Sequence, residues 1–385
     1  MLTKNISLKS FLRKGGEKKI KEKFKSILIE KNELFNSMSK NYNDSFNSQR
    51  IKKICSKKDI RIIGMGGSIL GTQAIYFFLK DKIKKKFYFV NNLEPQKKKD
   101  DGKKKINIII SKSGNTLETI SNANIYLKKK DSNIFITENK KSYLYELASK
   151  LKAEIIYHNN FIGGRYSVLS EVGMLPAELM GLNPNKFRQF NNLIQNKKYL
   201  NLLIQNTNSI LYFSKVKKFN SIILNYDQKS NYLFQWYQQL VAESLGKKGK
   251  GILPIISNMP KDNHSVMQLY LDGFKNNFFT FFYCGQKQSD KLDKNKLLSS
   301  YKYLGSAKIN EIMLKQKNAT ENVFRVRNIP FRSFTLKKRD EKTLGEIFCY
   351  FILETILLGR ALKINPFDQP SVELIKKETK KLFYS

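Results

Sequence analysis

Asp59–Gly71 reads DIRIIGMGGSILG, a short apolar stretch that runs into a glycine-rich turn and then into a helix-like segment. Glycines at a strand-to-helix turn let the backbone adopt positive φ and approach a ligand closely. The free N–H groups at the start of the helix favour an anion, most often a phosphate. The dinucleotide-binding pattern needs glycine at Ile69 and the P-loop needs lysine at Thr72, so neither motif fits. The alternative is a glycine-rich turn that binds no ligand.

Short apolar segments alternate with longer helix-like ones downstream of this turn. This alternation is typical of a parallel sheet that is covered by helices on both faces. We predict strands at Arg61–Ile63, Phe87–Val90, Ile106–Ile110, Ile134–Thr137 and Glu154–Tyr157, and helices at Thr72–Lys80, Thr116–Lys130 and Ser142–Lys152. The fold class is therefore α/β, and a ligand is expected beyond the carboxyl ends of the strands.

A second loop of the same kind follows the third predicted strand. Ser111–Thr119 reads SKSGNTLET and again leads from a strand through small hydroxyl residues into a helix. Two such loops above neighbouring strands could surround one phosphate, with hydroxyl donors from Ser68, Ser111, Ser113 and Thr116. The alternative is that Asn115 or Thr116 only caps the next helix, although a capped N-terminus also attracts anions.

Two charged residues are candidates for chemistry beside these loops. Gly163 and Gly164 precede Arg165, and this tight backbone would aim the guanidinium at a fixed place, before a buried helix at Ser167–Met180. A longer predicted helix starts at Asn231 and ends at Gly246; it places Gln239 and Glu243 on one face because they are four residues apart. A surface arginine and a solvated glutamate are the alternatives.

The rest of the chain predicts a second α/β layer. A helical segment at Asn185–Lys218 leads to it; strands are expected at Ser221–Leu224, Ile252–Ser257, Asn276–Phe282 and Asn322–Val326, and helices near Lys296–Gln316 and Asp340–Leu362. His264 stands at an expected helix start, whereas His158 follows an apolar strand and is interpreted as a structural polar residue. Ile364–Phe383 predicts a turn and an amphipathic helix with Gln369 and Lys376 near its start, and a solvated lysine is the alternative there.

Composition indicates a globular protein. The 385 residues, 41% of them hydrophobic, suffice for two domains, and the spacing of Ile20, Phe24 and Ile27 predicts one or two helices within residues 1–50. The three cysteines and two histidines do not form a metal-binding pattern. No signal-peptide pattern opens the chain, and the longest apolar run, Ile347–Leu358, is too short to span a bilayer. We expect a soluble protein of the cytoplasm that does not enter a membrane.

The chain carries 71 Lys and Arg against 32 Asp and Glu, a formal net charge of +39. These basic residues are spread over the whole sequence, and no recognition helix, zinc finger or RNA-binding motif is visible. We therefore expect no specific nucleic-acid partner. The positive field would still speed the encounter with anionic substrates. A basic nucleic-acid-binding protein is the alternative class, and it would show binding that weakens steeply with salt.

Six segments, taken together and in this order, resemble the glucose-6-phosphate isomerase (phosphoglucose isomerase) family: GMGGSILG, SKSGNTLET, GGRYSVLSEVGMLP, QQLVAESLGKKGKG, DNHS and NPFDQPSVELIK. They extend from about Ile62 to Lys376. The resemblance implies two sugar-isomerase-type (SIS) three-layer α/β/α domains with mainly parallel sheets, at residues 51–184 and 185–385, after an N-terminal helical segment at 1–50. It also implies a homodimer that interconverts glucose 6-phosphate and fructose 6-phosphate, in glycolysis and gluconeogenesis, without a metal or organic cofactor.

The resemblance further implies a role for single residues. Glu243 is similar to the base that moves a proton between C1 and C2, and Arg165 to the arginine that stabilises the enediolate. His264, reaching in from the partner subunit, and Lys376 would assist ring opening and closure. Residues expected to contact the phosphosugar substrate are Gly67, Ser68, Ser111, Lys112, Ser113, Gly114, Asn115, Thr116, Gln239 and Gln369. The alternative is a non-catalytic SIS-type protein that binds a phosphosugar and needs only the phosphate loops.

Overall fold

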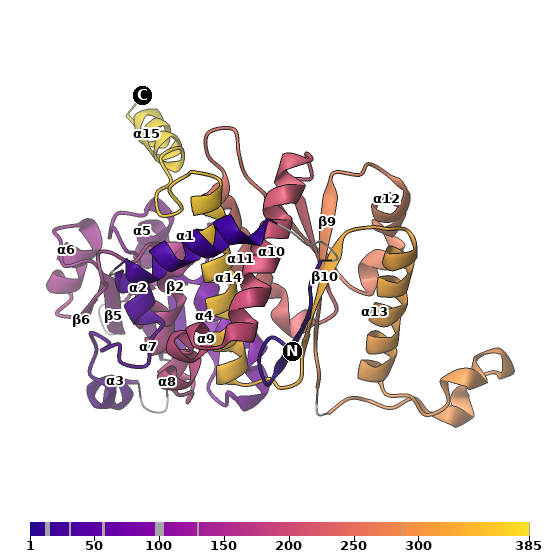
Figure 1. Ribbon diagram of the computed structural model, residues 1–385. Helices are drawn as coiled ribbons and strands as arrows, with labels where there is room; N and C mark the ends of the chain where they lie inside the picture. Colours follow the sequence, from indigo (N-terminus) through magenta and orange to yellow (C-terminus); the bar gives the residue numbers. More distant parts are fainter. Residues whose placement is uncertain are drawn as a thin grey trace.

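The computed structural model of the chain describes residues 1–11, 16–30, 32–55, 58–96, 104–128, 131–286 and 288–384. Two five-stranded sheets lie on either side of a central group of helices (Figure 1). None of the helices in these ranges is long and apolar enough to cross a membrane. The α/β class and the parallel sheets predicted from the sequence are confirmed.

The first sheet has the order β3-β2-β4-β5-β6, and all of its strands are parallel. Its strands are β2 (Asp59–Gly64), β3 (Phe87–Val90), β4 (Lys105–Ile110), β5 (Ser132–Thr137) and β6 (Glu154–Tyr157), and the intervening helices are α4 (Leu70–Phe78), α5 (Leu117–Tyr126) and α6 (Tyr143–Lys150). These five strands and three helices are confirmed, although Lys129 and Lys130, at the end of one predicted helix, lie outside the described residues. The strands could be predicted because apolar residues dominate them, although β2 also buries Arg61 and β4 also buries Lys105 and Asn107.

The second sheet has the order β1-β10-β9-β7-β8, with only β1 antiparallel to its neighbour. Its strands are β1 (Ile6–Lys9), β7 (Asn220–Asn225), β8 (Leu253–Asn258), β9 (Asn277–Cys284) and β10 (Phe331–Leu336). The strand predicted at Asn322–Val326 is wrong, because this segment is the last turn and a half of helix α13 (Ile309–Val326). The helix predicted near Lys296–Gln316 starts too early, because α13 begins only at Ile309.

β10 was not predicted, because Arg332, Ser333 and Thr335 interrupt its apolar residues and leave no continuous apolar run. Arg332 is fully buried and donates to Glu354 from both terminal nitrogens, at 2.5 and 2.9 Å. Its Nε donates to Thr280 at 3.1 Å. A buried arginine is tolerated when a carboxylate pairs with it in a bidentate geometry and its other donor is satisfied. This ion pair ties the sheet to the central helix that carries Glu354.

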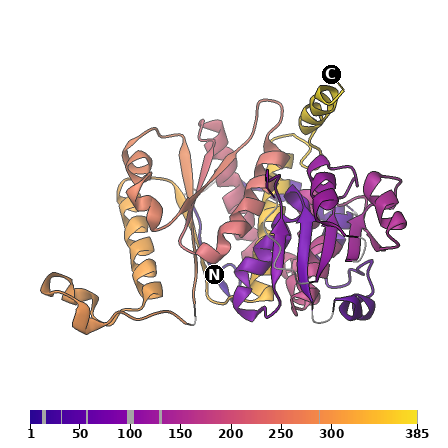
Figure 2. The ribbon, with the colours of Figure 1, turned by 180° about the vertical axis from the view of Figure 1, so that it is seen from behind.

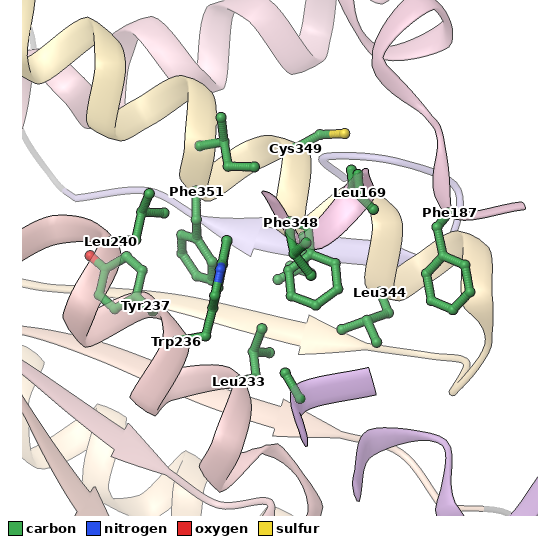
Figure 3. Packing of buried hydrophobic residues seen from close by; sticks show 14 of the residues in the cluster. Leu169, Phe187, Leu233, Trp236, Tyr237, Leu240, Leu344, Phe348, Cys349 and Phe351 are labelled. Atoms are coloured by element: carbon green, nitrogen blue, oxygen red, sulfur yellow. The ribbon is translucent and has the colours of Figure 1, made fainter. Parts of the chain in front are cut away.

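Helices α10 (Lys197–Lys215), α11 (Asn231–Leu245) and α14 (Glu341–Ala361) form the middle of the molecule, together with α4. α11 and α14 pack through aromatic pairs: Trp236 lies 4.8 Å from Phe348 and Tyr237 lies 4.5 Å from Phe351, between ring centroids (Figure 3). Because α11 also packs on α4 and on β8, it connects the first half of the chain to the second sheet.

The N-terminal segment contains both helices and a strand. Helix α1 (Glu17–Ile29) buries Ile20, Phe24 and Ile27 against α10 and α14, so the predicted helical spacing is confirmed. β1 corrects the expectation that residues 1–50 are only helical, because it extends the second sheet. The domain boundaries at 50/51 and 184/185 stay a prediction.

The described residues contain seven further helices. They are α2 (Glu33–Ser37), α3 (Ser48–Ile54), α7 (Glu171–Leu179), α8 (Pro184–Phe187), α9 (Phe190–Ile194), α12 (Met267–Asp272) and α15 (Val372–Leu382). α15 has no buried residue, and both views of the ribbon show it projecting from the body of the molecule (Figures 1 and 2).

Candidate active site

The first glycine-rich loop joins β2 to α4 through a 3₁₀ turn, η1 (Gly66–Ser68). Gly66 has a φ of +54°, a value that favours glycine. A Cβ atom at Gly67 would lie only 2.2 Å from the carbonyl carbon of Gly164, so these two backbones are in direct contact. The loop that carries Ser68 therefore packs directly against the segment that carries Arg165.

The second glycine-rich loop begins beside the first. Gly64 at the end of β2 pairs with Ile110 at the end of β4, so the loops leave neighbouring strands at the same edge of the sheet. The hydroxyls of Ser111 and Thr116 are hydrogen-bonded at 2.9 Å, and the Asn115 N–H donates to Ser113 Oγ at 3.3 Å. Both loops thus end in small hydroxyl residues at one edge, as predicted.

Gly114 and Lys112 shape the same loop. Gly114 has a φ of +65°, and a Cβ atom there would lie 2.1 Å from Ser142 Oγ. Lys112 donates to the carbonyl of Asn160 at 2.8 Å and pairs with Glu138 at 3.4 Å. The ammonium of Lys112 is therefore held at the side of the loop by protein partners.

The alternative role of Thr116, as a cap of the next helix, is supported by its position but not by its hydrogen bonds. Thr116 is the N-cap residue of α5, yet its side chain makes no capping hydrogen bond, since its hydroxyl pairs with Ser111. The Asn115 side chain accepts from the N–H of Tyr143, at the start of another helix. The hydroxyls of Ser111 and Thr116 therefore do not bond to the backbone N–H groups of the helix that follows.

Arg165 is buried, not on the surface, and every nitrogen of its guanidinium has an acceptor. Its Nε donates to Ser244 Oγ at 2.7 Å, and Nη1 lies 3.6 Å from the Glu243 carboxylate. The C-terminal segment supplies the other acceptors: Gln369 Oε1 at 2.7 Å from Nη1, and the carbonyls of Pro366 and Asp368 at 2.7 and 3.1 Å from Nη2. The guanidinium is fixed by groups from two distant parts of the chain, residues 243–244 and residues 366–369.

Glu243 lies in the last turn of α11 and faces a shallow groove of about 530 Å³. Gln239, one turn earlier, also lines the groove and donates to the Glu243 carboxylate at 3.2 Å. The buried Oε1 of Gln239 has no hydrogen-bond partner among the described residues. The predicted shared face of Gln239 and Glu243 is thus confirmed, and Glu243 is partly accessible while Arg165 is not.

His264 and Lys376 lie apart from this group. His264 ends the 3₁₀ turn η5 (Lys261–His264) and lines a different pocket of about 560 Å³ with Gln228, Asn258 and other residues of the second half. Lys376 lies on the projecting helix α15 and pairs with Glu373 at 2.6 Å. A single chain therefore brings together the two glycine-rich loops, Arg165, Gln239, Glu243 and Gln369, but not His264 or Lys376.

Several residues that build the site were not singled out in the sequence. Ser244 accepts from Arg165 and is hydrogen-bonded to the Tyr166 hydroxyl at 2.8 Å, and Trp236 Nε1 donates to the Arg165 carbonyl at 3.1 Å. Burial raises the pKa of Tyr166, which keeps its hydroxyl protonated as a donor to Pro366. The sequence signal was that Tyr166, Ser244 and Pro366 belong to the conspicuous GGRYSVL, ESLGK and NPFDQP segments.

His158 has the structural role expected for it. Its ring nitrogens lie 3.0 Å from Glu171 Oε1 and 3.0 Å from the carbonyl of Ile162. Glu171 also accepts from the Tyr42 hydroxyl and the Asn159 N–H. Among the residues that the structure describes, no group of three or more His, Cys, Asp or Glu could hold a metal ion.

The arrangement combines an anion site with a carboxylate and a fixed cation. Backbone N–H groups and hydroxyls at the ends of β2 and β4 suit a phosphate. A partly exposed carboxylate near them can accept a proton from a bound molecule. Arginine keeps its positive charge at any working pH and can stabilise negative charge that develops on an oxygen.

Comparison with known proteins agrees with this reading. A model of the phosphoglucose isomerase family matches residues 3–384. The glucose-6-phosphate isomerase of Methanocaldococcus jannaschii is 33% identical over 349 residues, which cover 86% of each chain. The protein of the same name from Mycoplasmopsis synoviae is 32% identical over 350 residues, covering 82% of this chain and 80% of the relative.

Solved structures agree in fold. A hypothetical protein from Thermus thermophilus superposes with a TM-score of 0.85 at 21% identity, over 96% of this chain and 95% of the other. A glucose-6-phosphate isomerase from Chlamydia trachomatis superposes with a TM-score of 0.72 at 17% identity, over 91% of this chain and 78% of the other. Because the family model covers almost the whole sequence, this chain belongs to the phosphoglucose isomerase family.

Proposed function

We propose that this protein interconverts glucose 6-phosphate and fructose 6-phosphate. The observation that carries the proposal is the pair of Glu243 and Arg165, 3.6 Å apart, beside two phosphate-type loops in a chain of this family. A protein that only binds a phosphosugar needs the loops but has no use for a carboxylate next to a fixed arginine. The non-catalytic alternative is therefore not favoured.

The reaction moves one proton between two carbons. Glu243 takes the proton from C2 of the open-chain aldose and returns it to C1, while a second proton passes from the C2 hydroxyl to the C1 oxygen, which gives the ketose. A positioned carboxylate base typically contributes about 10²–10⁴-fold to such a step. Arg165 stabilises the negative charge of the enediolate, because its guanidinium is already fixed before the charge develops.

The phosphate group anchors the sugar at a distance from the reacting carbons. Ser68, Ser111, Ser113 and Thr116 and the N–H groups of their loops are the proposed phosphate ligands. Gln239 Oε1, which has no partner among the described residues, is the proposed acceptor for a sugar hydroxyl. Binding energy from the phosphate then supports orientation at C1 and C2.

We further propose that the active protein is a homodimer with His264 shared across the interface. In one chain, His264 lines a pocket that has no lining residue in common with the Glu243 groove, which supports a role in a neighbouring subunit. His264 and Lys376 would open and close the sugar ring, a step that needs proton transfer to and from the ring oxygen.

A coupled assay tests the proposed function. Fructose 6-phosphate is supplied, and the glucose 6-phosphate formed is detected through a dehydrogenase specific for it. The matched control is the Glu243→Gln protein purified from the same host, because any contaminating isomerase would be present there too. Turnover by the wild type with loss in the control supports the proposal; equal rates in both would remove it.

A further inference from the structure

The turn that follows helix α11 is built tightly and carries three lysines. The N–H of Lys247 donates to the carbonyl of Lys250 at 3.0 Å, and the N–H of Lys250 donates back at 2.9 Å. Between them, Lys248 and Gly249 have φ values of +51° and +65°. Two central residues with positive φ define the tight type I′ geometry of two-residue turns. Lys247 and Lys250, as the paired residues, project to the same side.

Both paired lysines reach the segment that follows α14, which we call the strap (residues 362–369). Lys247 Nζ donates to the carbonyl of Asn365 at 2.5 Å and pairs with the Asp368 carboxylate at 2.7 Å. Lys250 Nζ donates to the carbonyl of Leu362 at 2.8 Å. The Lys247 side chain is only 11% exposed, so this ion pair is partly shielded from water on the lysine side.

The same strap fixes the catalytic arginine. The carbonyls of Pro366 and Asp368 and the side chain of Gln369 accept from Arg165. Asp368 thus faces two ways: its backbone carbonyl holds Arg165, and its carboxylate is held by Lys247. The hydrogen bond and charge of Lys247 lower the pKa of the Asp368 carboxyl, which keeps it ionised for this pair.

We propose that Lys247 is a positioning residue for Arg165, acting through Asp368 and the strap. It lines neither the Glu243 groove nor the pocket of His264, so it acts on Arg165 through the strap. Without Lys247 the strap loses two anchors, and the acceptors that orient the guanidinium can shift. This inference rests on the proposed isomerase function, because it assigns Arg165 its task in the reaction.

The first test compares two neighbouring lysines of one turn. Lys247→Met removes the anchor, whereas Lys248→Met removes the same charge from an exposed position on the same turn. We expect kcat of Lys247→Met to fall by about 10- to 100-fold, since small misplacements of a catalytic group cost up to roughly that much. KM for fructose 6-phosphate should change little, because the phosphate loops lie elsewhere. Lys248→Met should behave as the wild type.

A binding measurement separates misplacement of Arg165 from a general structural effect. Arabinonate 5-phosphate carries a carboxylate that imitates the enediolate charge, whereas glucitol 6-phosphate is an uncharged polyol at that end. Lys247→Met should bind the first compound about tenfold more weakly and the second with unchanged affinity, both measured by calorimetry, if Arg165 is displaced. Equal weakening of both compounds would contradict the proposal.

A second variant distinguishes the loss of the ion pair from a Lys247 substitution that only prevents folding. Asp368→Asn keeps the shape of the strap and removes its charge, and it should reproduce the loss of kcat with unchanged Tm. Lys247→Met added to Asp368→Asn should then cost much less than it costs alone, because both act on one contact. Lys247→Arg, which keeps a cation, should retain more activity than Lys247→Met.

Failure of the positioning role is distinguishable from failure of the proposed function. A wild-type protein without turnover would remove the isomerase assignment, while the calorimetric comparison would still test whether Lys247 orients Arg165. An active wild type in which Lys247→Met keeps full kcat and full affinity for arabinonate 5-phosphate would overturn the positioning role alone. Full additivity of Lys247→Met and Asp368→Asn would overturn it as well.

Discussion

Glu243 accepts a hydrogen bond from Gln239 and forms an ion pair with the buried Arg165 at 3.6 Å. Replacing Glu243 by Gln preserves the size of the side chain and removes the acceptor for the substrate proton. We expect exchange of the C2 proton with solvent to fall by at least about 10²-fold, since a positioned base contributes 10²–10⁴-fold.

Phosphate binding should survive in the same variant, because the phosphate loops do not depend on Glu243. Affinity for glucitol 6-phosphate therefore provides the control. Proton exchange at a substantial fraction of the wild-type rate would show that another group is the base.

Glu171 gives the fold a predictable response to acid. Burial acts against its charge, but the hydrogen bonds of His158 and of backbone N–H groups, together with the charge of His158, lower the pKa of Glu171 below its ordinary value of 4.5. A carboxyl group with a lowered pKa in the folded state stabilises the fold above its ordinary pKa, and this stabilisation is lost as the pH falls through the lowered value.

Glu171→Gln should therefore reduce the free energy of unfolding at pH 7 by about 1.5–3 kcal/mol, the usual range for hydrogen bonds to a charged group. The difference from the wild type should shrink toward pH 3. Urea unfolding at both pH values measures it, with the exposed Glu22→Gln as control. A difference that is the same at both pH values would argue against an ionised Glu171 as the cause.

At the scale of elements, the contact between the first glycine loop and the Arg165 segment leaves no room for a side chain. A Cβ atom at Gly67 would lie 2.2 Å from the carbonyl carbon of Gly164, whereas at Gly164 the nearest atom would be 3.9 Å away. Gly67→Ala should thus destabilise the fold by at least about 1–3 kcal/mol, the usual cost of overpacking, and Gly164→Ala should not. Thermal unfolding of the pair checks this, and equal Tm values would show that the backbone relaxes freely.

Elements that bury uniform apolar runs could be predicted, and elements that depend on distant partners could not. Apolar residues dominate the five strands of the first sheet, which could be predicted although β2 also buries Arg61 and β4 also buries Lys105 and Asn107. β10 contains Arg332, which is acceptable there only because Glu354 on α14 neutralises it. Asn322–Val326 has the composition of a strand, but it continues α13 without a helix-breaking residue, so the helix extends through it.

The same distinction between local sequence signals and distant contacts applies to the candidate site. Arg165, Glu243 and the loop hydroxyls stand in distinctive local sequences, and the neighbouring ends of β2 and β4 make the two loops adjacent. The partners of Arg165 lie up to 204 positions away in the chain, and no local pattern marks the carbonyls of Pro366 and Asp368 as its acceptors. Contacts of this kind appear only once the fold is known.

At the scale of the whole molecule, a shared site makes activity depend on association. We expect that mixing His264→Ala subunits with Glu243→Gln subunits restores activity, because one of the two sites in each heterodimer then combines an intact Glu243 with an intact His264 from the other chain. About a quarter of the wild-type activity per subunit is expected after full random exchange, since half of the dimers are then mixed and each has one whole site.

Each inactive variant exchanged with itself is the control, and native mass spectrometry verifies that mixed dimers form. Activity that stays flat despite verified exchange would show that Glu243 and His264 act within one chain. The isomerase assignment itself would be unaffected by that outcome.

The pairing of β1 with β10 also has a consequence for biosynthesis. Ile6 is translated long before Leu336, which becomes its neighbour in the sheet. At about 5–20 residues per second, the ribosome adds the partner strand roughly 15 to 65 seconds later. The first sheet, whose strands all lie between Asp59 and Tyr157, can form long before that. The second sheet gains β1 as its edge strand only after β10 has been translated, so a nascent chain stalled before residue 331 would carry β1 unpaired.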